Sequence, residues 1–277
     1  MSDFLAMMTP EFISAILLPA LIGGIAVTLC SSLLGVSLVL KRYSMIGDGL
    51  SHVGFGALSI AAVAGLAPLK VAIPVVVVAA VVLLRMSERG HLKGDSAIAI
   101  FSTSALAVGI LVSSKAGLMQ DVSSYMFGSI LAMSKEDVAL SVGLSVLVIG
   151  AYLILYHRIY AVTFDEEFSR ATGINVRFYN TLLAVLTAIT VVLGMMMMGS
   201  LLISSLIIFP SVSAMRVCRS FRGVVVCSAL ISVFCFLLGF FVSLTMNTAP
   251  GASVVVANLL IFAIFSLIGV LRGRSAS

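Results

Sequence analysis

The chain has 277 residues, of which 61% are hydrophobic and only 10% are charged, whereas a soluble domain has roughly 45–50% and 25%. This composition excludes a soluble globular protein and favours a single all-α transmembrane domain over residues 1–277, in which apolar side chains face lipid. The formal net charge of +5 does not indicate nucleic-acid binding, because the basic residues are scattered between apolar stretches.

Apolar stretches long enough to cross a membrane recur along the whole chain, and each span needs about 20 such residues. The sequence predicts nine spans, at 13–39, 44–64, 68–85, 96–114, 138–156, 178–197, 199–216, 224–246 and 252–271. The run 178–216 is nearly continuous, so it crosses twice only if the chain turns tightly near Gly199; otherwise the bundle has eight spans. Because the N-terminus lacks the basic region of a signal peptide, we expect no segment to be removed.

The basic residues indicate the orientation of the bundle, because short cytoplasmic loops collect Lys and Arg. With the N-terminus outside, all but three of the 16 basic residues fall in inner loops, and the three that remain outside are Lys70, Lys115 and Lys135. We therefore predict that the N-terminus is outside and the C-terminus is in the cytoplasm.

The second predicted span, 44–64, contains Asp48 and His52 four residues apart, and hence on one helical face. A carboxylate deep in the bilayer costs about 2.5–3.5 kcal/mol, so it should face the bundle interior. Carboxylate and imidazole are ligands that suit zinc, manganese or iron. Three interpretations remain open for the pair: a metal path, a proton relay, or an internal contact that fixes helix packing.

The outside connection 115–137 has an apolar centre, Tyr125 to Met133, that is too short to cross. We expect this segment to lie at the membrane interface or to re-enter between helices.

The most polar part of the chain is the inside loop 157–177. Thr163 followed three residues later by Glu166 forms a capping box, and Gly173 is suited to end a helix. We expect a short cytoplasmic helix over about 164–172. It cannot cross the membrane, so it serves either as a capped connector or as a docking helix for a partner.

Other residue types that often carry chemistry are interpreted as structural. The four cysteines form no C-x-x-C pair, and we expect apolar packing for Cys30, Cys218, Cys227 and Cys235. The run Met195 to Met198 points around a helix rather than at one site, which favours lipid contact and gap filling over a copper site. The chain has no phosphate-binding G-x-x-x-x-G-K-[ST] loop, so any ATP that drives transport must be hydrolysed by another chain.

Four segments together resemble the permeases of bacterial ABC importers for zinc, manganese and iron. They are SMIGDGLSHVGFGA at 44–57, FGSILAMSKED at 127–137, FDEEFSRATGIN at 164–175 and GSLLISSLIIFPSVSA at 199–214. The resemblance implies a non-enzymatic subunit of the bacterial inner membrane that binds no cofactor itself. Its implied partners are a second permease subunit, a cytoplasmic ATPase dimer that binds ATP, and an extracytoplasmic metal-binding protein.

The resemblance also implies roles for particular residues. Asp48 and His52 would line the path of zinc or manganese in an alternating-access cycle, and 164–173 would be the segment that couples to the ATPase. The implied ATPase contacts are Phe164, Asp165, Glu166, Glu167, Phe168, Ala171 and Gly173. Asn247 stands where relatives often carry an acid, which leaves the preferred metal open. The alternative function is a proton-coupled metal carrier with Asp48 and His52 as its relay.

Overall fold

The computed structural model describes residues 17–88, 94–118, 135–246 and 248–271. The regular structure within these ranges is helical throughout, as the sequence predicts. The helices are α3 (Leu18–Leu40), α4 (Ile46–Val63), α5 (Pro68–Glu88), α6 (Gly94–Lys115), α8 (Lys135–Ile154), α9 (Tyr156–Phe164), α10 (Glu166–Ala171), α11 (Val176–Met198), α12 (Ser200–Val217), α13 (Phe221–Met246) and α14 (Pro250–Leu271).

Eight helices of the described chain are long and apolar enough to cross a membrane, and the bent pair α8–α9 brings the total to nine. The predicted count of eight or nine spans is therefore confirmed. The run 178–216 does divide into two helices, and the break is at Gly199. This residue has φ 90° and ψ 157°, a backbone conformation that is essentially restricted to glycine.

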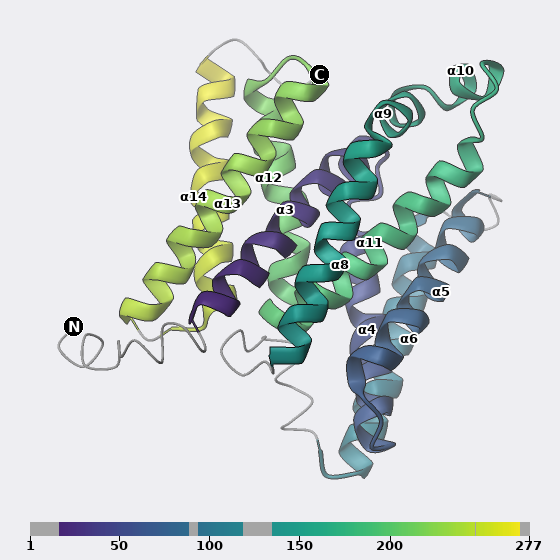
Figure 1. Cartoon of the computed structure of the whole chain (residues 1–277), viewed down its shortest axis with the longest axis vertical. Helices are drawn as coiled ribbons and strands as arrows, with labels where there is room; N and C mark the ends of the chain where they lie inside the picture. The colour runs from purple at the N-terminus through teal and green to yellow at the C-terminus, as the bar shows by residue number, and fades with distance from the viewer. Residues whose placement is uncertain (1–16, 89–93, 119–134, 247, 272–277) are drawn as a thin grey trace.

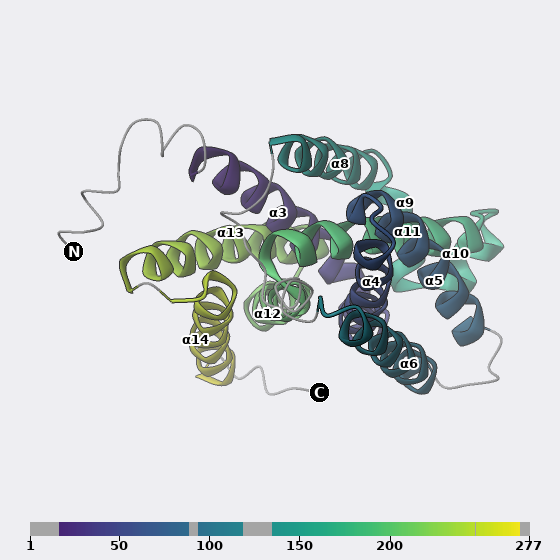
Figure 2. The same cartoon turned by 90° about the horizontal axis from the view of Figure 1, so that it is seen from below.

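α3 lies at the centre of the bundle, where it contacts α8, α11, α12 and α13. Figures 1 and 2 show α12, α13 and α14 on one side of it and α4, α5 and α6 on the other. α11 and α12 connect the two sides, because each of them contacts both α3 and α4. The helix that carries Asp48 and His52 thus meets the rest of the bundle through α11 and α12.

Small residues allow the helices to approach closely where the two sides are built. A side chain on Gly56 of α4 would come within 2.6 Å of the backbone oxygen of Ala105 in α6. A side chain on Gly239 of α13 would come within 2.4 Å of the Cα atom of Val254 in α14. Contacts of this kind are the usual packing mode of helices in lipid.

Several buried hydroxyl groups bond to the backbone of their own helix. Ser51 and Ser59 of α4 donate to the carbonyl oxygens four residues earlier, at 2.7 and 2.8 Å, and Thr187 of α11 does the same at 2.7 Å. This local bonding satisfies the hydroxyls without a partner on another helix.

The methionine run at the end of α11 differs from its prediction. Met195, Met197 and Met198 are buried at 2% exposure or less, so lipid contact is wrong for these three. Their side chains occupy the space left by glycines on neighbouring helices: Met195 lies beside Gly54, and Met197 lies beside Gly23. Gap filling is confirmed, because flexible thioether chains adapt to the irregular surfaces that glycine leaves.

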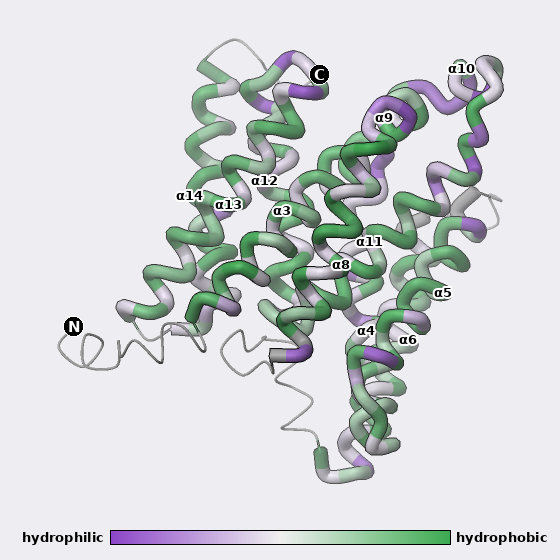
Figure 3. The backbone as a smooth tube through the Cα atoms, viewed as in Figure 1, coloured by the Kyte–Doolittle hydropathy of each residue, from purple (hydrophilic) through white to green (hydrophobic). Residues whose placement is uncertain are grey.

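Hydrophilic residues gather at one end of the bundle. In Figure 3 they surround α9, α10 and the turn between α12 and α13 at the top of the view, while the long helices are mostly apolar. The predicted connection over 115–137 lies for the most part outside the described residues, as does Asn247.

Candidate metal path and coupling segment

Asp48 and His52 come together as their spacing on α4 predicts. His52 Nε2 lies 3.7 Å from Asp48 Oδ2, and the hydroxyl of Ser204 on α12 donates to Asp48 Oδ1 at 3.5 Å. Asp48 is in the first turn of α4, where the positive end of the helix dipole stabilises a carboxylate. Ser204 could not be predicted from the sequence, because nothing in its apolar surroundings indicates which helix α12 faces.

The side chains of Asp48 and His52 make few hydrogen bonds within one chain. The Asp48 side chain is 45% exposed and that of His52 is 22% exposed, although α4 is among the most buried helices. His52 Nδ1 is buried and has no hydrogen-bond partner in the described structure. Because a half-exposed carboxylate cannot face hydrocarbon cheaply, this side of α4 is not suited to contact with lipid chains.

One chain does not complete a metal site within the part that the structure describes. No group of three or more His, Cys, Asp and Glu side chains comes together there. Structural zinc sites have four ligands and manganese prefers more. If Asp48 and His52 hold a metal, they therefore need further ligands from outside this pair.

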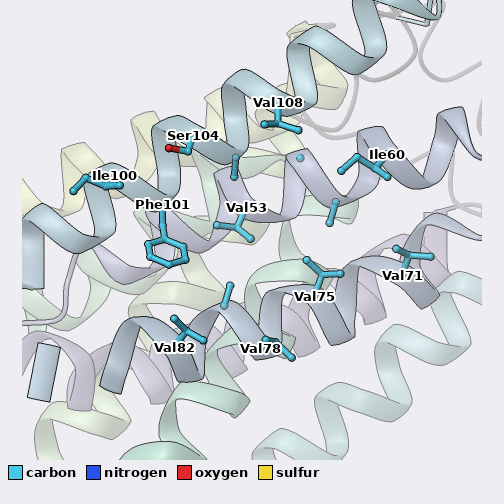
Figure 4. A pocket seen from close by; sticks show the side chains of 14 residues that line it. Val53, Ile60, Val71, Val75, Val78, Val82, Ile100, Phe101, Ser104 and Val108 are labelled. Carbon is cyan, nitrogen blue, oxygen red and sulfur yellow. The ribbon is translucent and has the colours of Figure 1, made fainter. Parts of the chain in front are cut away.

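A large apolar cavity on the other side of α4 is not suited to a metal. It measures about 580 Å³ and lies between α4, α5 and α6. Figure 4 shows that valines dominate its lining, with the Ser104 hydroxyl as one of its few polar groups. Divalent metals need oxygen or nitrogen ligands, so the metal path is better placed along Asp48 and His52.

The short helix predicted over 164–172 exists, but its start differs from the prediction. α10 begins at Glu166, and Asp165 is its N-cap, since Asp165 Oδ1 accepts the N–H of Phe168 at 2.8 Å. Thr163 is instead inside α9 and donates to the carbonyl of Ile159 at 2.7 Å. The predicted capping box is wrong because α9 continues to Phe164, and the extended backbone of Asp165 places its carboxylate over the new helix.

Both ends of this segment are sharply defined. α9 bends by 68° from α8, which turns the chain away from the direction of the spans. Gly173 has φ 83°, and its N–H donates to the carbonyl of Arg170 at 3.1 Å, so it ends α10 as predicted.

A partly buried ion pair links α10 to the bundle. Lys41, directly after α3, donates to Glu166 Oε1 at 2.5 Å and to Asn180 Oδ1 of α11 at 2.7 Å, and Asn180 Nδ2 donates to Glu166 at 3.2 Å. Partial burial works to raise the pKa of Glu166, but hydrogen bonds from Lys41 and Asn180 and the charges of Lys41 and Arg170 outweigh it and lower the pKa below its ordinary value. Glu166 was predicted from the sequence as part of the coupling segment, but its partners Lys41 and Asn180 were not. The only feature that marks these two in the sequence is their position as polar residues near the ends of spans.

The aromatic residues of the segment face outward. Phe164 is 61% exposed and Phe168 is 64% exposed. Phe164 also packs against Tyr160 and Phe221, with ring centroids 4.9 and 5.9 Å away. Exposed phenylalanine on a helix that is otherwise polar is typical of a surface that another protein covers.

Comparison with known proteins gives a consistent picture. The model of a family described as "ABC 3 transport family" matches residues 14–269. The manganese import system permease protein ScaB of Streptococcus gordonii is 29% identical over 88% of this chain and 87% of its own length. The high-affinity zinc uptake system membrane protein ZnuB of Haemophilus influenzae is 28% identical over 89% of this chain and 95% of its own.

Two solved structures share the fold. The structure of PsaBC from Streptococcus pneumoniae in complex with Fab superposes with a TM-score of 0.82 and 27% identity, and covers 95% of this chain and 94% of that one. An inward-facing ABC transporter structure superposes with a TM-score of 0.76 at 18% identity, over 96% and 90% of the two chains.

Proposed function

Since the chain belongs to the ABC 3 transport family and is thus a multi-pass, non-catalytic permease of a bacterial ABC importer for manganese or zinc, we propose that Asp48 and His52 line its metal path. The observation that carries this proposal is the incomplete ligand pair. It combines a half-exposed carboxylate with an imidazole 3.7 Å away, at a place in the bundle where lipid alone could not surround it.

A second permease subunit would complete the ligand set. If two copies meet around a two-fold axis at this side of α4, they bring two carboxylates and two imidazoles to one place. Four such ligands match the coordination number of zinc and supply most of that of manganese. The same contact would cover the exposed side of Asp48.

Alternating access follows from the weakness of each half-site. An ion released on the outside would be held by both copies while they are close, and separation of the copies would leave it with two ligands on each side. The cation would then pass towards the cytoplasm, which we assign to the α9–α10 end because basic residues gather there. A site shared between two moving subunits can thus bind and release the metal ion through the movement of whole helices, with each ligand side chain fixed in place on its own helix.

The segment around α10 would transmit the motion from a cytoplasmic ATPase dimer. The ATPase would contact the exposed side of the segment, at Phe164, Glu167, Phe168 and Ala171. Movement of α10 reaches the bundle through the Lys41–Glu166 pair, and Lys41 directly follows α3, the central helix. Asp165 and Gly173 would shape the segment rather than contact the partner. The other partner would be an extracytoplasmic metal-binding protein that delivers the ion.

Metal uptake by cells that carry the complete importer tests the path. Asp48→Asn and His52→Gln each remove one ligand and should lower the uptake of zinc or manganese at least about tenfold. Glu136→Gln and His157→Gln make the same chemical changes away from α4 and should leave uptake unchanged. Normal uptake by the Asp48→Asn/His52→Gln double variant would contradict the proposal. Equal concentrations of zinc and manganese in competition would identify the preferred metal.

A proton-coupled carrier that uses the same pair as a relay fits the findings less well. Such a carrier needs no ATPase, whereas this chain belongs to a family of ABC transport proteins and has an exposed aromatic segment that a partner can cover.

A further inference from the structure

A polar cavity of about 490 Å³ lies beside α10, apart from Asp48 and His52. Three arginines from three different helices line it: Arg85 of α5, Arg170 of α10 and Arg177 of α11. Tyr43, in the turn between α3 and α4, contributes an aromatic wall. Segments far apart in the sequence therefore place positive charge around one hollow.

This charge is not balanced by the described residues. Glu166 is the acidic residue of the lining, and its carboxylate already bonds to Lys41 and also interacts with Arg170. Among the side chains that the structure describes, no carboxylate forms an ion pair with Arg85 or Arg177. Guanidinium groups gathered around a cavity favour an anion with several oxygens, and phosphate matches their planar fork best.

The position of these arginines points to phosphate at the membrane surface. Arg85 lies in the last turn of α5 and Arg177 in the first turn of α11, and both helices are membrane spans. Side chains at span ends lie at the depth of lipid headgroups, where arginine attracts anionic lipid. A site for a free anion would not have to lie at the depth of the lipid headgroups.

An apolar stripe on α5 leads directly to Arg85. Val71, Val75, Val78 and Val82 recur at intervals of three and four residues, so they share one face with Arg85. They also line the apolar cavity between α4, α5 and α6 (Figure 4). From Val71 to Val82 the stripe is about 16 Å long, close to half of a hydrocarbon core of about 30 Å. It therefore matches an acyl chain in one leaflet.

We propose that the cavity beside α10 binds the phosphate headgroup of an anionic phospholipid from the adjacent leaflet, with an acyl chain along the valine stripe of α5. A lipid in this position connects α5 to α10 and α11. It would hold the segment that we expect to meet the ATPase against the membrane surface, and the composition of the leaflet would then influence the complex. This inference does not depend on which metal is transported.

Binding of a fluorescent phosphatidylglycerol to the complete permease–ATPase complex, in nanodiscs of phosphatidylcholine, tests the site. The Arg85→Gln/Arg177→Gln double variant should weaken binding about tenfold or more, since each arginine near the surface contributes about 1 kcal/mol. The matched control is Arg158→Gln/Arg219→Gln, which removes the same charge from exposed residues of α9 and the α12–α13 turn at the same end of the bundle. It should change binding by less than about twofold. Arg85→Lys/Arg177→Lys keeps the charge but loses the planar fork, so its affinity should lie between that of the Gln variant and that of the unaltered protein.

Four outcomes would overturn the proposal. Unchanged binding in the Gln variant would show that the cavity does not hold the headgroup, and an equal loss in the control would reduce the effect to general surface charge. Displacement of the lipid by millimolar inorganic phosphate would identify the ligand as a free anion. If the Gln variant released the ATPase while its lipid affinity stayed normal, the cavity would be a protein contact. An unchanged melting temperature of the permease confirms in each case that the variant is folded.

Discussion

Two pairs of titratable side chains lie close together in the described part of this apolar bundle, and they differ in how completely they are hydrogen-bonded. In the Lys41–Glu166 pair, the lysine is 6% exposed and the two side chains also share Asn180. In the pair of Asp48 and His52, the closest atoms are 3.7 Å apart and one imidazole nitrogen has no partner. A pair that only holds helices together should be satisfied like the first one. The second pair retains capacity to bind, as expected for ligands of a passing ion.

The Lys41–Glu166 pair predicts a pH dependence of stability. Because the pKa of Glu166 is lowered in the folded chain, its stabilising contribution is fully present above the ordinary pKa of 4.5 and is lost as the pH falls through the folded pKa. We expect Glu166→Gln to lower the melting temperature at neutral pH and to have a smaller effect at about pH 4. Glu167→Gln, which changes an exposed neighbour, should have little effect at either pH. A constant difference between Glu166→Gln and the unaltered protein across this range would contradict the assignment.

Some contacts between side chains could be predicted from the sequence, and others could not. Spacing alone placed Asp48 and His52 on one face, because a helix fixes the relation of residues four apart. It could not place Ser204 or Asn180, which reach their partners across 156 and 14 residues of sequence. Contacts of this kind depend on which helices become neighbours, and an apolar helix of a membrane protein carries little pattern to indicate its neighbours.

At the scale of elements, composition and length fixed the spans well, because the thickness of the bilayer sets one required length for every helix. The ends were less predictable. The Thr163 motif has the right spacing for a cap, yet α9 continues past it and Asp165 serves instead. A capping motif marks the start of a helix only if the preceding residues are not already helical. At a bend between two helices, such as that between α9 and α10, a few neighbouring residues do not show where the first helix ends.

The break at Gly199 should be sensitive to any side chain. Gly199→Ala forces alanine to adopt φ 90° and ψ 157°, at a cost of about 1–3 kcal/mol. Gly143→Ala is the matched control, because Gly143 is inside α8 with no atoms near an added Cβ. There alanine should be neutral or stabilise the helix by up to about 1 kcal/mol. Thermal unfolding in detergent compares the two, and equal effects would show that the Gly199 backbone can relax.

The exposed face of α10 should carry much of the affinity for the ATPase. Phe168 is 64% exposed and contributes no packing that the bundle needs, so Phe168→Ala should weaken association with the ATPase about tenfold while leaving the melting temperature unchanged. Phe234→Ala truncates another exposed aromatic residue, 54% exposed on the membrane-spanning helix α13, and should not affect association. The affinity between the purified permease and ATPase subunits measures this effect. A loss of affinity only for Phe234→Ala would show that the ATPase does not bind at α10.

At the scale of the whole molecule, the incomplete ligand set predicts the stoichiometry of metal binding. If two copies share one ion between their Asp48 and His52 side chains, the assembled importer should bind about one high-affinity metal per two permease chains. Elemental analysis of the complex after dialysis measures this ratio. The same ratio must disappear in the Asp48→Asn variant, whereas Glu136→Gln should keep it. A co-expressed complex with one unaltered permease and one Asp48→Asn/His52→Gln permease provides the sharper comparison, because it keeps half of the ligands. Sharing requires that this mixed complex bind metal at least about tenfold more weakly, since each half-site alone is incomplete. One tightly bound ion per unaltered chain would instead mean that a single copy completes the site, and the two-fold arrangement would then be wrong.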